Sequence, residues 1–138
     1  MKGVDLLYDL SRSLDFIPSI SANEILAYDV LEHFPFGKVP KILNDWVRIL
    51  NIDGKIVIRV PDMRFIAKRL LSGELPAFEV QRLLFGGQEN DHDFHCMGFT
   101  GDFLEALLIG CGCSKIIQRV QGENEDPPSH NVTLVAVK

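Results

Sequence analysis

Residues 24–62 read EILAYDVLEHFPFGKVPKILNDWVRILNIDGKIVIRVPD, and this stretch decides the fold class. Glu24–Val30 is a short apolar run typical of a strand. In Val39–Leu50 the apolar positions recur at i, i+3, i+4 and i+7, which predicts an amphipathic helix. Lys55–Val60 (KIVIRV) is rich in β-branched apolar residues, so we expect a strand in the interior of a sheet. A strand, a helix and a second strand form the repeating unit of a parallel sheet.

Further elements are predicted on both sides of this stretch. Val4–Leu10 is an apolar run that we interpret as a buried strand. The elements expected downstream are helices at about Met63–Leu71 and Pro76–Phe85, a helix that Thr100 caps and Gly110 or Gly112 ends, and strands at Ser114–Val120 and Asn131–Val137. The pattern predicts one α/β domain spanning residues 1–138. Its sheet is expected to be mainly parallel with a C-terminal antiparallel strand pair, and its helices to lie on the faces.

The composition fits one globular domain and argues against several classes of protein. Fourteen basic and nineteen acidic residues give a net charge of -5, which disfavours nucleic acid and anionic membranes as main ligands. Asp5 and Asp9 interrupt the apolar run that a secretory signal would need, and no stretch approaches the roughly 18 apolar residues of a membrane span. Three cysteines are too few for a disulfide framework. We therefore expect a cytoplasmic protein.

The central stretch resembles the second half of class I S-adenosylmethionine-dependent methyltransferases, above all small predicted methyltransferases with a VLEHF segment after the fourth strand. Trp46, Arg48 and Leu50 match the family's Trp-x-Arg-x-Leu helix, while Asp53 stands in place of a glycine in the following turn. Residues 86–100 (GGQENDHDFHCMGFT) are similar to the family's later loop. The resemblance covers nearly the whole chain and implies a truncated Rossmann-like methyltransferase fold without its first two strands.

The resemblance also assigns roles to individual residues. Asp9, at the end of the third strand, would accept the adenine amino group of the cofactor, with Leu10 beside the ring. The segment bordering the methionine end of the cofactor would be Asp29, Val30 and Leu31. The residues on the substrate side would be Glu32, His33, His92 and His95. Methyl transfer requires alignment of donor and acceptor, plus a base where the acceptor must lose a proton, and His33 is the candidate catalytic base.

One part of the family pattern is missing from this sequence. The family holds the amino-acid end of its cofactor with a glycine-rich loop between the first strand and a helix. The glycine clusters here are Gly86-Gly87 and Gly110-Cys111-Gly112, and neither is expected to follow a strand and open a helix. We therefore expect S-adenosylmethionine as the family cofactor, weak or absent binding by this isolated chain, and impaired or absent activity.

Three hypotheses of function remain open. The first is a methyltransferase acting on an unknown small-molecule or macromolecular acceptor. The second is a non-catalytic binding or interaction module derived from a methyltransferase. The third is a metal-dependent hydrolase using His92–Cys96, which we disfavour because histidines in such loops are more often solvated or substrate-facing; no metal is expected. Asp9 is equally consistent with a turn cap, and Glu32-His33 with the solvated start of a helix.

The missing strands carry an expectation about assembly. In the full fold the first and second strands lie between the third and the fourth. Without them, apolar strands keep unpaired backbone groups at their edges, which favour pairing with another chain. We expect a two-fold homodimer that buries the N-terminal strand region, with a chain supplying the missing half as the alternative partner.

Overall fold

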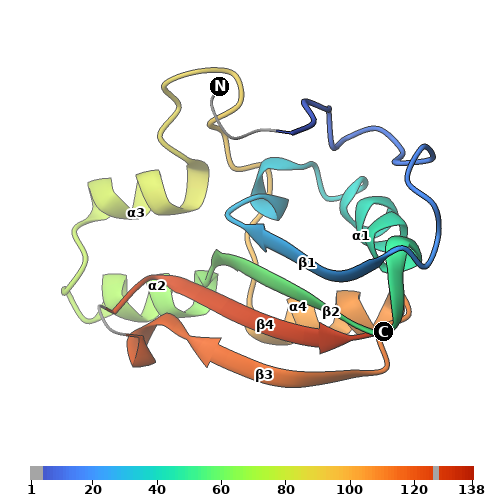
Figure 1. The fold of residues 1–138 in the computed structure, drawn as a ribbon. Coiled ribbons are helices and arrows are strands. Elements are labelled where there is room, and N and C mark those ends of the chain that lie inside the picture. Colours follow the sequence, from blue (N-terminus) through green and yellow to red (C-terminus); the bar gives the residue numbers. More distant parts are fainter. Residues whose placement is uncertain (1–4, 126–127) are drawn as a thin grey trace.

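The computed structural model describes residues 5–125 and 128–138. Its strands form one mixed sheet in the order β1-β2-β4-β3 (Figure 1). The strands are β1 (Ala22–Tyr28), β2 (Leu50–Pro61), β3 (Lys115–Gln121) and β4 (Asn131–Val137). β1 runs parallel to β2, whereas β4 runs antiparallel to both β2 and β3. The Lys55–Val60 segment therefore lies inside the sheet, as predicted.

The helices match the apolar periodicity of the sequence closely. They are α1 (Val39–Ile49), α2 (Met63–Leu71), α3 (Ala77–Phe85) and α4 (Gly101–Gly110), together with the short 3-10 turns η1 (Leu31–His33) and η2 (Gly122–Asn124). The Thr100 side chain caps α4 by accepting from the Phe103 N–H at 3.3 Å, as the sequence predicts. Among the described residues, no helix has the length and apolar character needed to cross a membrane.

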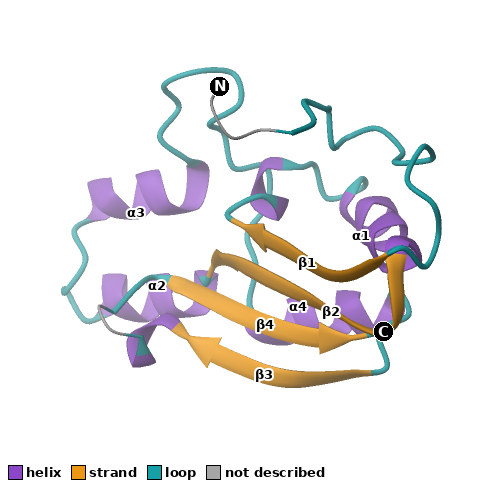
Figure 2. Ribbon diagram, viewed as in Figure 1, coloured by secondary structure: helices purple, strands orange, loops and turns teal. Residues whose placement is uncertain are grey.

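The main core lies between the sheet and two helices, α1 and α4, which pack on the same face (Figure 2). Ile56, Ile58 and Leu134 are completely buried on the sheet side, and Leu104 is completely buried on α4. Trp46 is 5% exposed and belongs to this core, as its place in the helix stripe predicts. Each fully buried aliphatic side chain contributes roughly 1.5–3 kcal/mol by leaving water.

No described helix covers the opposite face of the sheet, which is turned toward the viewer in Figure 1. Leu26 and Tyr28 of β1 are 57% and 49% exposed there. Leu26 is aligned with Val57 of β2, and Val57 with Val135 of β4, so an apolar row crosses three strands. The core helices α1 and α4 cover the other face, in agreement with the expectation that helices lie on the faces of the sheet.

The predicted strand at Val4–Leu10 is wrong over its described part, because residues 5–10 have no partner strand; Val4 lies outside the described residues. Asp9 instead begins a turn. Its carboxylate accepts from the Ser11 N–H at 2.9 Å, and its carbonyl accepts from the Arg12 N–H at 3.0 Å. Such local bonds compete with strand pairing. The sheet therefore contains one parallel and two antiparallel strand pairs, so it is mixed and not mainly parallel.

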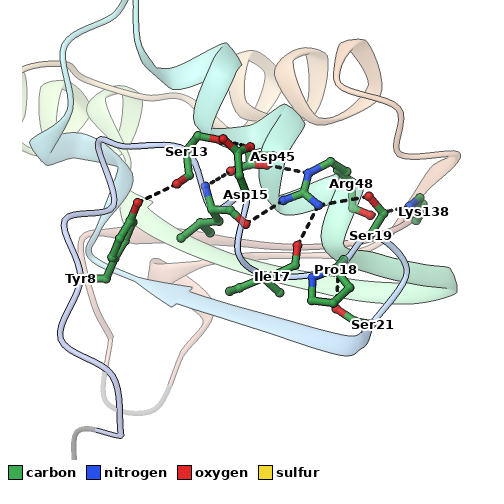
Figure 3. A network of polar contacts seen from close by, with 11 residues as sticks. Tyr8, Ser13, Asp15, Ile17, Pro18, Ser19, Ser21, Asp45, Arg48 and Lys138 are labelled. Atoms are coloured by element: carbon green, nitrogen blue, oxygen red, sulfur yellow. Dashed lines mark hydrogen bonds and ion pairs between the residues drawn. The ribbon is translucent and has the colours of Figure 1, made fainter.

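The segment that follows packs against α1, where Asp45 and Arg48 hold it (Figure 3). The Leu14 N–H donates to Asp45 Oδ2 at 2.6 Å. The Arg48 guanidinium donates to the Leu14 carbonyl at 3.0 Å, to the Ile17 carbonyl at 2.9 Å, and to Asp45 Oδ1 at 2.7 Å. These charge-assisted bonds fix an irregular segment beside β1, at the edge of the sheet where a strand was expected.

The turn that the sequence places at Asp53 is an irregularity within β2. Leu50 is aligned with Ala22, and Lys55 with Glu24, so the intervening residues bulge out of the strand pair. Asp53 has a φ of 62°, in the left-handed region that favours glycine. Aspartate is among the few other residues that tolerate this conformation, which accounts for its presence where the resembling family has glycine.

Candidate functional site

The carboxyl end of β1 is fixed by an ion pair with the neighbouring strand. Asp29 follows β1 with a φ of 55°, and its carboxylate is bonded to the Arg59 guanidinium, with Nε 3.2 Å from Oδ1. The Asp29 N–H also donates to the Arg59 carbonyl at 2.9 Å. The Arg59 guanidinium lies 5.2 Å from the centre of the Tyr28 ring. Hydrogen bonding to Asp29 raises the pKa of Arg59, so the guanidinium is positively charged at neutral pH.

Glu32 lies three residues further along, in η1, and is 1% exposed. Neither of its carboxylate oxygens has a hydrogen-bond partner among the described residues. Burial, with a smaller contribution from the Asp29 charge, raises the pKa of Glu32 to about 7. An ionised carboxylate buried without a partner costs several kcal/mol, so this side chain takes up a proton or a cation readily.

The backbone of Glu32 joins η1 to the loop that follows α3. The Glu32 carbonyl accepts from the Cys96 N–H at 2.7 Å and from the Met97 N–H at 3.3 Å. In Figure 1 this loop descends from above α3 to the turn after β1. The contact places His95 beside His33, with the ring centres 4.9 Å apart and the planes nearly perpendicular.

Both imidazole rings are oriented by backbone carbonyls. His33 Nδ1 lies 3.1 Å from the Phe94 carbonyl oxygen, and His95 Nδ1 lies 3.1 Å from the Leu83 carbonyl oxygen. A carbonyl only accepts, so each Nδ1 carries the hydrogen. Burial, and to a lesser extent the neighbouring His33, lower the pKa of His95. His95 is therefore neutral at neutral pH and keeps a lone pair on Nε2.

The structure brings Glu32, His33 and His95 together, with one potential ligand atom from each within 4.8 Å of the others. These are three of the four residues assigned to the substrate side. The fourth, His92, is exposed and is absent from this cluster. Its backbone N–H is bonded to the Asn90 side chain at 2.9 Å, so His92 belongs to a turn at the outer part of the loop.

The residues assigned to the cofactor do not gather at one place. Leu10 and Val30 line one apolar cavity of about 400 Å³ along β1, and Leu10 also lines a second of about 340 Å³ against α1. Leu31 is completely buried in the core. Asp9 is exposed, with Arg12 Nε 3.4 Å from its carboxylate, and hydrogen bonds from Ser11 lower the pKa of Asp9.

Arg59 was missed by sequence reasoning. A basic residue inside the apolar KIVIRV strand was the available signal, because a charge within a central strand generally has a partner. Pairing of β1 with β2 supplies that partner one residue beyond the end of β1. The position of Glu32 was expected, but its complete burial follows only from the packing of the 86–99 loop over η1.

Several solved structures with a similar arrangement of strands and helices are methyltransferases. An O-methyltransferase family protein from Burkholderia thailandensis matches 96% of this chain with a TM-score of 0.63 at 13% identity, and this chain covers 35% of it. A possible histamine N-methyltransferase from Thermotoga maritima matches 96% with a TM-score of 0.62 at 14% identity, and this chain covers 63% of it. A 1,6-didemethyltoxoflavin-N1-methyltransferase from B. thailandensis, with S-adenosylhomocysteine bound, matches 94% with a TM-score of 0.59 at 14% identity, and this chain covers 48% of it.

The chain therefore has the Rossmann-like fold of S-adenosylmethionine-dependent methyltransferases over the part that it spans, which confirms the predicted fold class. It covers between 31% and 66% of the length of the neighbours compared. The neighbour from Thermotoga maritima and another from Archaeoglobus fulgidus are S-adenosylmethionine-dependent methyltransferases. No family model matches the chain, and no curated protein sequence matches it.

The residues described fit the cofactor only in part. Gly86 ends α3 with a φ of 81°, and Gly110 is the last residue of α4. Both glycine clusters thus follow helices, as expected. No described glycine cluster lies between a strand and the start of a helix, where backbone N–H groups would cradle the carboxylate of the cofactor. The cavity beside Leu10 and Val30 offers an apolar wall and no such cradle.

Proposed function

We propose that this chain forms the acceptor side of an S-adenosylmethionine-dependent methyltransferase. One observation carries the proposal: Glu32, His33 and His95 converge just beyond the carboxyl end of β1. In sheets of this class, ligands bind outside the carboxyl ends of the strands. The fold shared with solved methyltransferases supports the same reaction class.

His33 is the proposed base for an acceptor that must lose a proton. Its Nδ1–H is directed to the Phe94 carbonyl, which leaves Nε2 as a proton acceptor. Asp29 is held by Arg59 and shapes the turn that presents Glu32 and His33. The nature of the acceptor is open between a small molecule and a macromolecule.

For the cofactor, we propose that Leu10 and Val30 contact its apolar parts in the cavity beside β1 and that Asp9 approaches the adenine end. Asp29 would lie toward the methionine end, and Leu31 would support the segment from the core. The carboxylate cradle has to come from residues other than those described. We therefore propose that the isolated chain is impaired or inactive.

We also propose a cytoplasmic location, because the three free cysteines fit a reducing compartment.

Backbone amide mapping by NMR tests this proposal. Millimolar S-adenosylhomocysteine should shift signals of the residues that line the cavity beside β1, including Val30 and Leu10, and leave α2 and α3 unchanged. A Val30→Asp variant should lose these shifts, whereas Val120→Asp on β3 should keep them. Shifts that are confined to another part of the chain, or that are equal over the whole chain, would contradict the proposed contacts of the cofactor beside β1.

A second candidate function, a non-catalytic interaction module, is favoured by the open edge of the sheet. Within the described residues no strand pairs with the outer edge of β1. Leu26 and Ile20 are each 57% exposed beside it. We propose that a second copy of the chain covers this edge, since two identical edge strands pair readily about a two-fold axis; a chain supplying the missing half is the alternative.

A further inference from the structure

The trio of Glu32, His33 and His95 has a feature that methyl transfer does not explain. Both oxygens of a completely buried carboxylate lack a hydrogen-bond partner within the described residues. Two half-buried imidazoles stand next to it, with ligand atoms within 4.8 Å. Buried carboxylates are retained when they are paired with cations or coordinate metals. Glu32 is bonded to no lysine or arginine in the described part of the chain, so a metal ion is the missing partner that the geometry suggests.

The hydrogen bonds of the two histidines also support a metal site. Histidines that ligate metals almost always donate their other ring N–H to a carbonyl or carboxylate, which fixes the ring and its tautomer. His33 donates from Nδ1 to the Phe94 carbonyl, and His95 from Nδ1 to the Leu83 carbonyl. Both rings are thus held with Nε2 free. The two acceptor carbonyls belong to different segments, so the orientation of each ring is fixed independently.

We propose that Glu32, His33 and His95 form a binding site for a divalent transition-metal ion of the zinc class. Two imidazoles and one carboxylate suit such an ion, whereas magnesium and calcium prefer oxygen ligands. Within residues 5–125 and 128–138 this is the single group of three such side chains. A three-ligand set leaves a coordination position open for water or another oxygen ligand. This site does not depend on the proposed methyl transfer, and a metal ion bound to His33 Nε2 would occupy the lone pair that the proposed base needs, so the two roles of His33 exclude each other.

The site is tested by titrating the protein with Co²⁺ while its visible absorption is recorded. The bound Co²⁺ is then displaced with Zn²⁺. The exposed thiol of Cys96 lies next to His95 in the sequence, so the experiment uses Cys96→Ser as the parent chain. We expect one Co²⁺ per chain with the intense bands of a low-coordinate site. His33→Ala and His95→Ala should each weaken Zn²⁺ binding by about 100-fold or more. Even the mutation of a residue that only hydrogen-bonds to a ligand lowers metal affinity by about 10–100-fold. His92→Ala, in the same loop, should leave affinity and stoichiometry unchanged.

Thermal unfolding separates a metal site from a purely structural cluster. Without metal, Glu32→Gln should be at least as stable as the parent, because the change removes an unpaired buried charge. Zn²⁺ should raise the Tm of the parent and leave that of Glu32→Gln unchanged. Absence of stoichiometric binding by the folded parent would overturn the proposal. The proposal would also be overturned if His92→Ala lost as much Zn²⁺ affinity as His33→Ala and His95→Ala. The same holds if Glu32→Gln were less stable than the parent in the absence of metal.

Discussion

Arg59 in the middle of the sheet is paired with Asp29, the first residue beyond the neighbouring strand β1. The pair is formed by a guanidinium and a carboxylate that are 37% and 42% exposed as side chains. It closes the turn from β1 into η1, and Asp29 adopts a positive φ there. The orientation of Glu32 and His33, which follow directly, therefore depends on a contact between two strands that are distant in the sequence.

Replacement of Asp29 with Asn should lower the free energy of unfolding by about 1 kcal/mol or less. Asparagine tolerates the positive φ, and a half-exposed ion pair contributes little against solvent screening. Urea unfolding monitored by circular dichroism measures the change. Asp29→Val should cost clearly more, because a β-branched residue is strained at this φ. Equal losses in both variants would show that the backbone conformation is unimportant.

Arg48 should matter far more for stability than other surface arginines. Arg48→Met removes bonds to Asp45 and to the carbonyls of Leu14 and Ile17. We expect a loss of about 2–4 kcal/mol, since bonds to charged groups are each worth roughly 1.5–3 kcal/mol and are not additive. Limited proteolysis should then cut within residues 11–19.

The matched control for that change is Arg12→Met. Within the described residues, Arg12 pairs only with exposed Asp9, and its side chain is 74% exposed. Its replacement should alter the free energy of unfolding by no more than about 0.5 kcal/mol. Similar losses for Arg12 and Arg48 would refute the claim that the Arg48 contacts hold the N-terminal segment.

The three thiols should differ sharply in reactivity. Burial raises the pKa of Cys113 to about 11 and raises that of Cys111 as well, whereas Cys96 is exposed. A raised pKa keeps the thiol protonated, so at pH 8 only about 0.1% of Cys113 is the reactive thiolate. Iodoacetamide labelling followed by peptide mass spectrometry should modify Cys96 first. Reactivity of Cys113 should appear only as the pH approaches its pKa or the chain unfolds, and early labelling of Cys113 would contradict its burial.

Cofactor affinity of the isolated chain should be low. Without a backbone cradle for the cofactor carboxylate, two or three charge-assisted bonds are lost, which costs about two to six decades of affinity. Calorimetric titration with S-adenosylmethionine should give no heat at micromolar concentration. A one-to-one micromolar isotherm would mean that other residues replace the cradle; in that case Asp9→Ala would show whether Asp9 contributes, and His33→Ala should reduce turnover more than binding.

The open edge of β1 predicts self-association. Light scattering at micromolar concentration should give the mass of a dimer, whereas a monomer of 15.5 kDa would contradict it. Leu26→Lys on β1 should shift the protein to monomer. Ile117→Lys provides the control, because Ile117 is 46% exposed on β3 at the opposite edge of the sheet. If Ile117→Lys dissociated the dimer and Leu26→Lys did not, the interface would lie at the β3 edge of the sheet and not at the β1 edge.

The sequence by itself determined the helices, the central strands and the fold class. Apolar periodicity predicted α1 to within one residue and α2 in full, and the β-branched run predicted the interior position of β2. These features depend on residues close in the chain, whose spacing decides which face is buried. The position of Glu32 and His33 after β1 followed from the resemblance to methyltransferases.

Tertiary structure alone decided the edge of the sheet and the content of the site. Val4–Leu10 has strand-like composition, but a strand exists only when a partner is available, and the turn at Asp9 and the anchoring of Leu14 by Asp45 prevent pairing. His95 reaches Glu32 because a loop without apolar periodicity bonds to the Glu32 carbonyl. Such contacts join residues far apart in the chain, and their hydrogen bonds depend on how the packed elements meet, which no local pattern of residue types records.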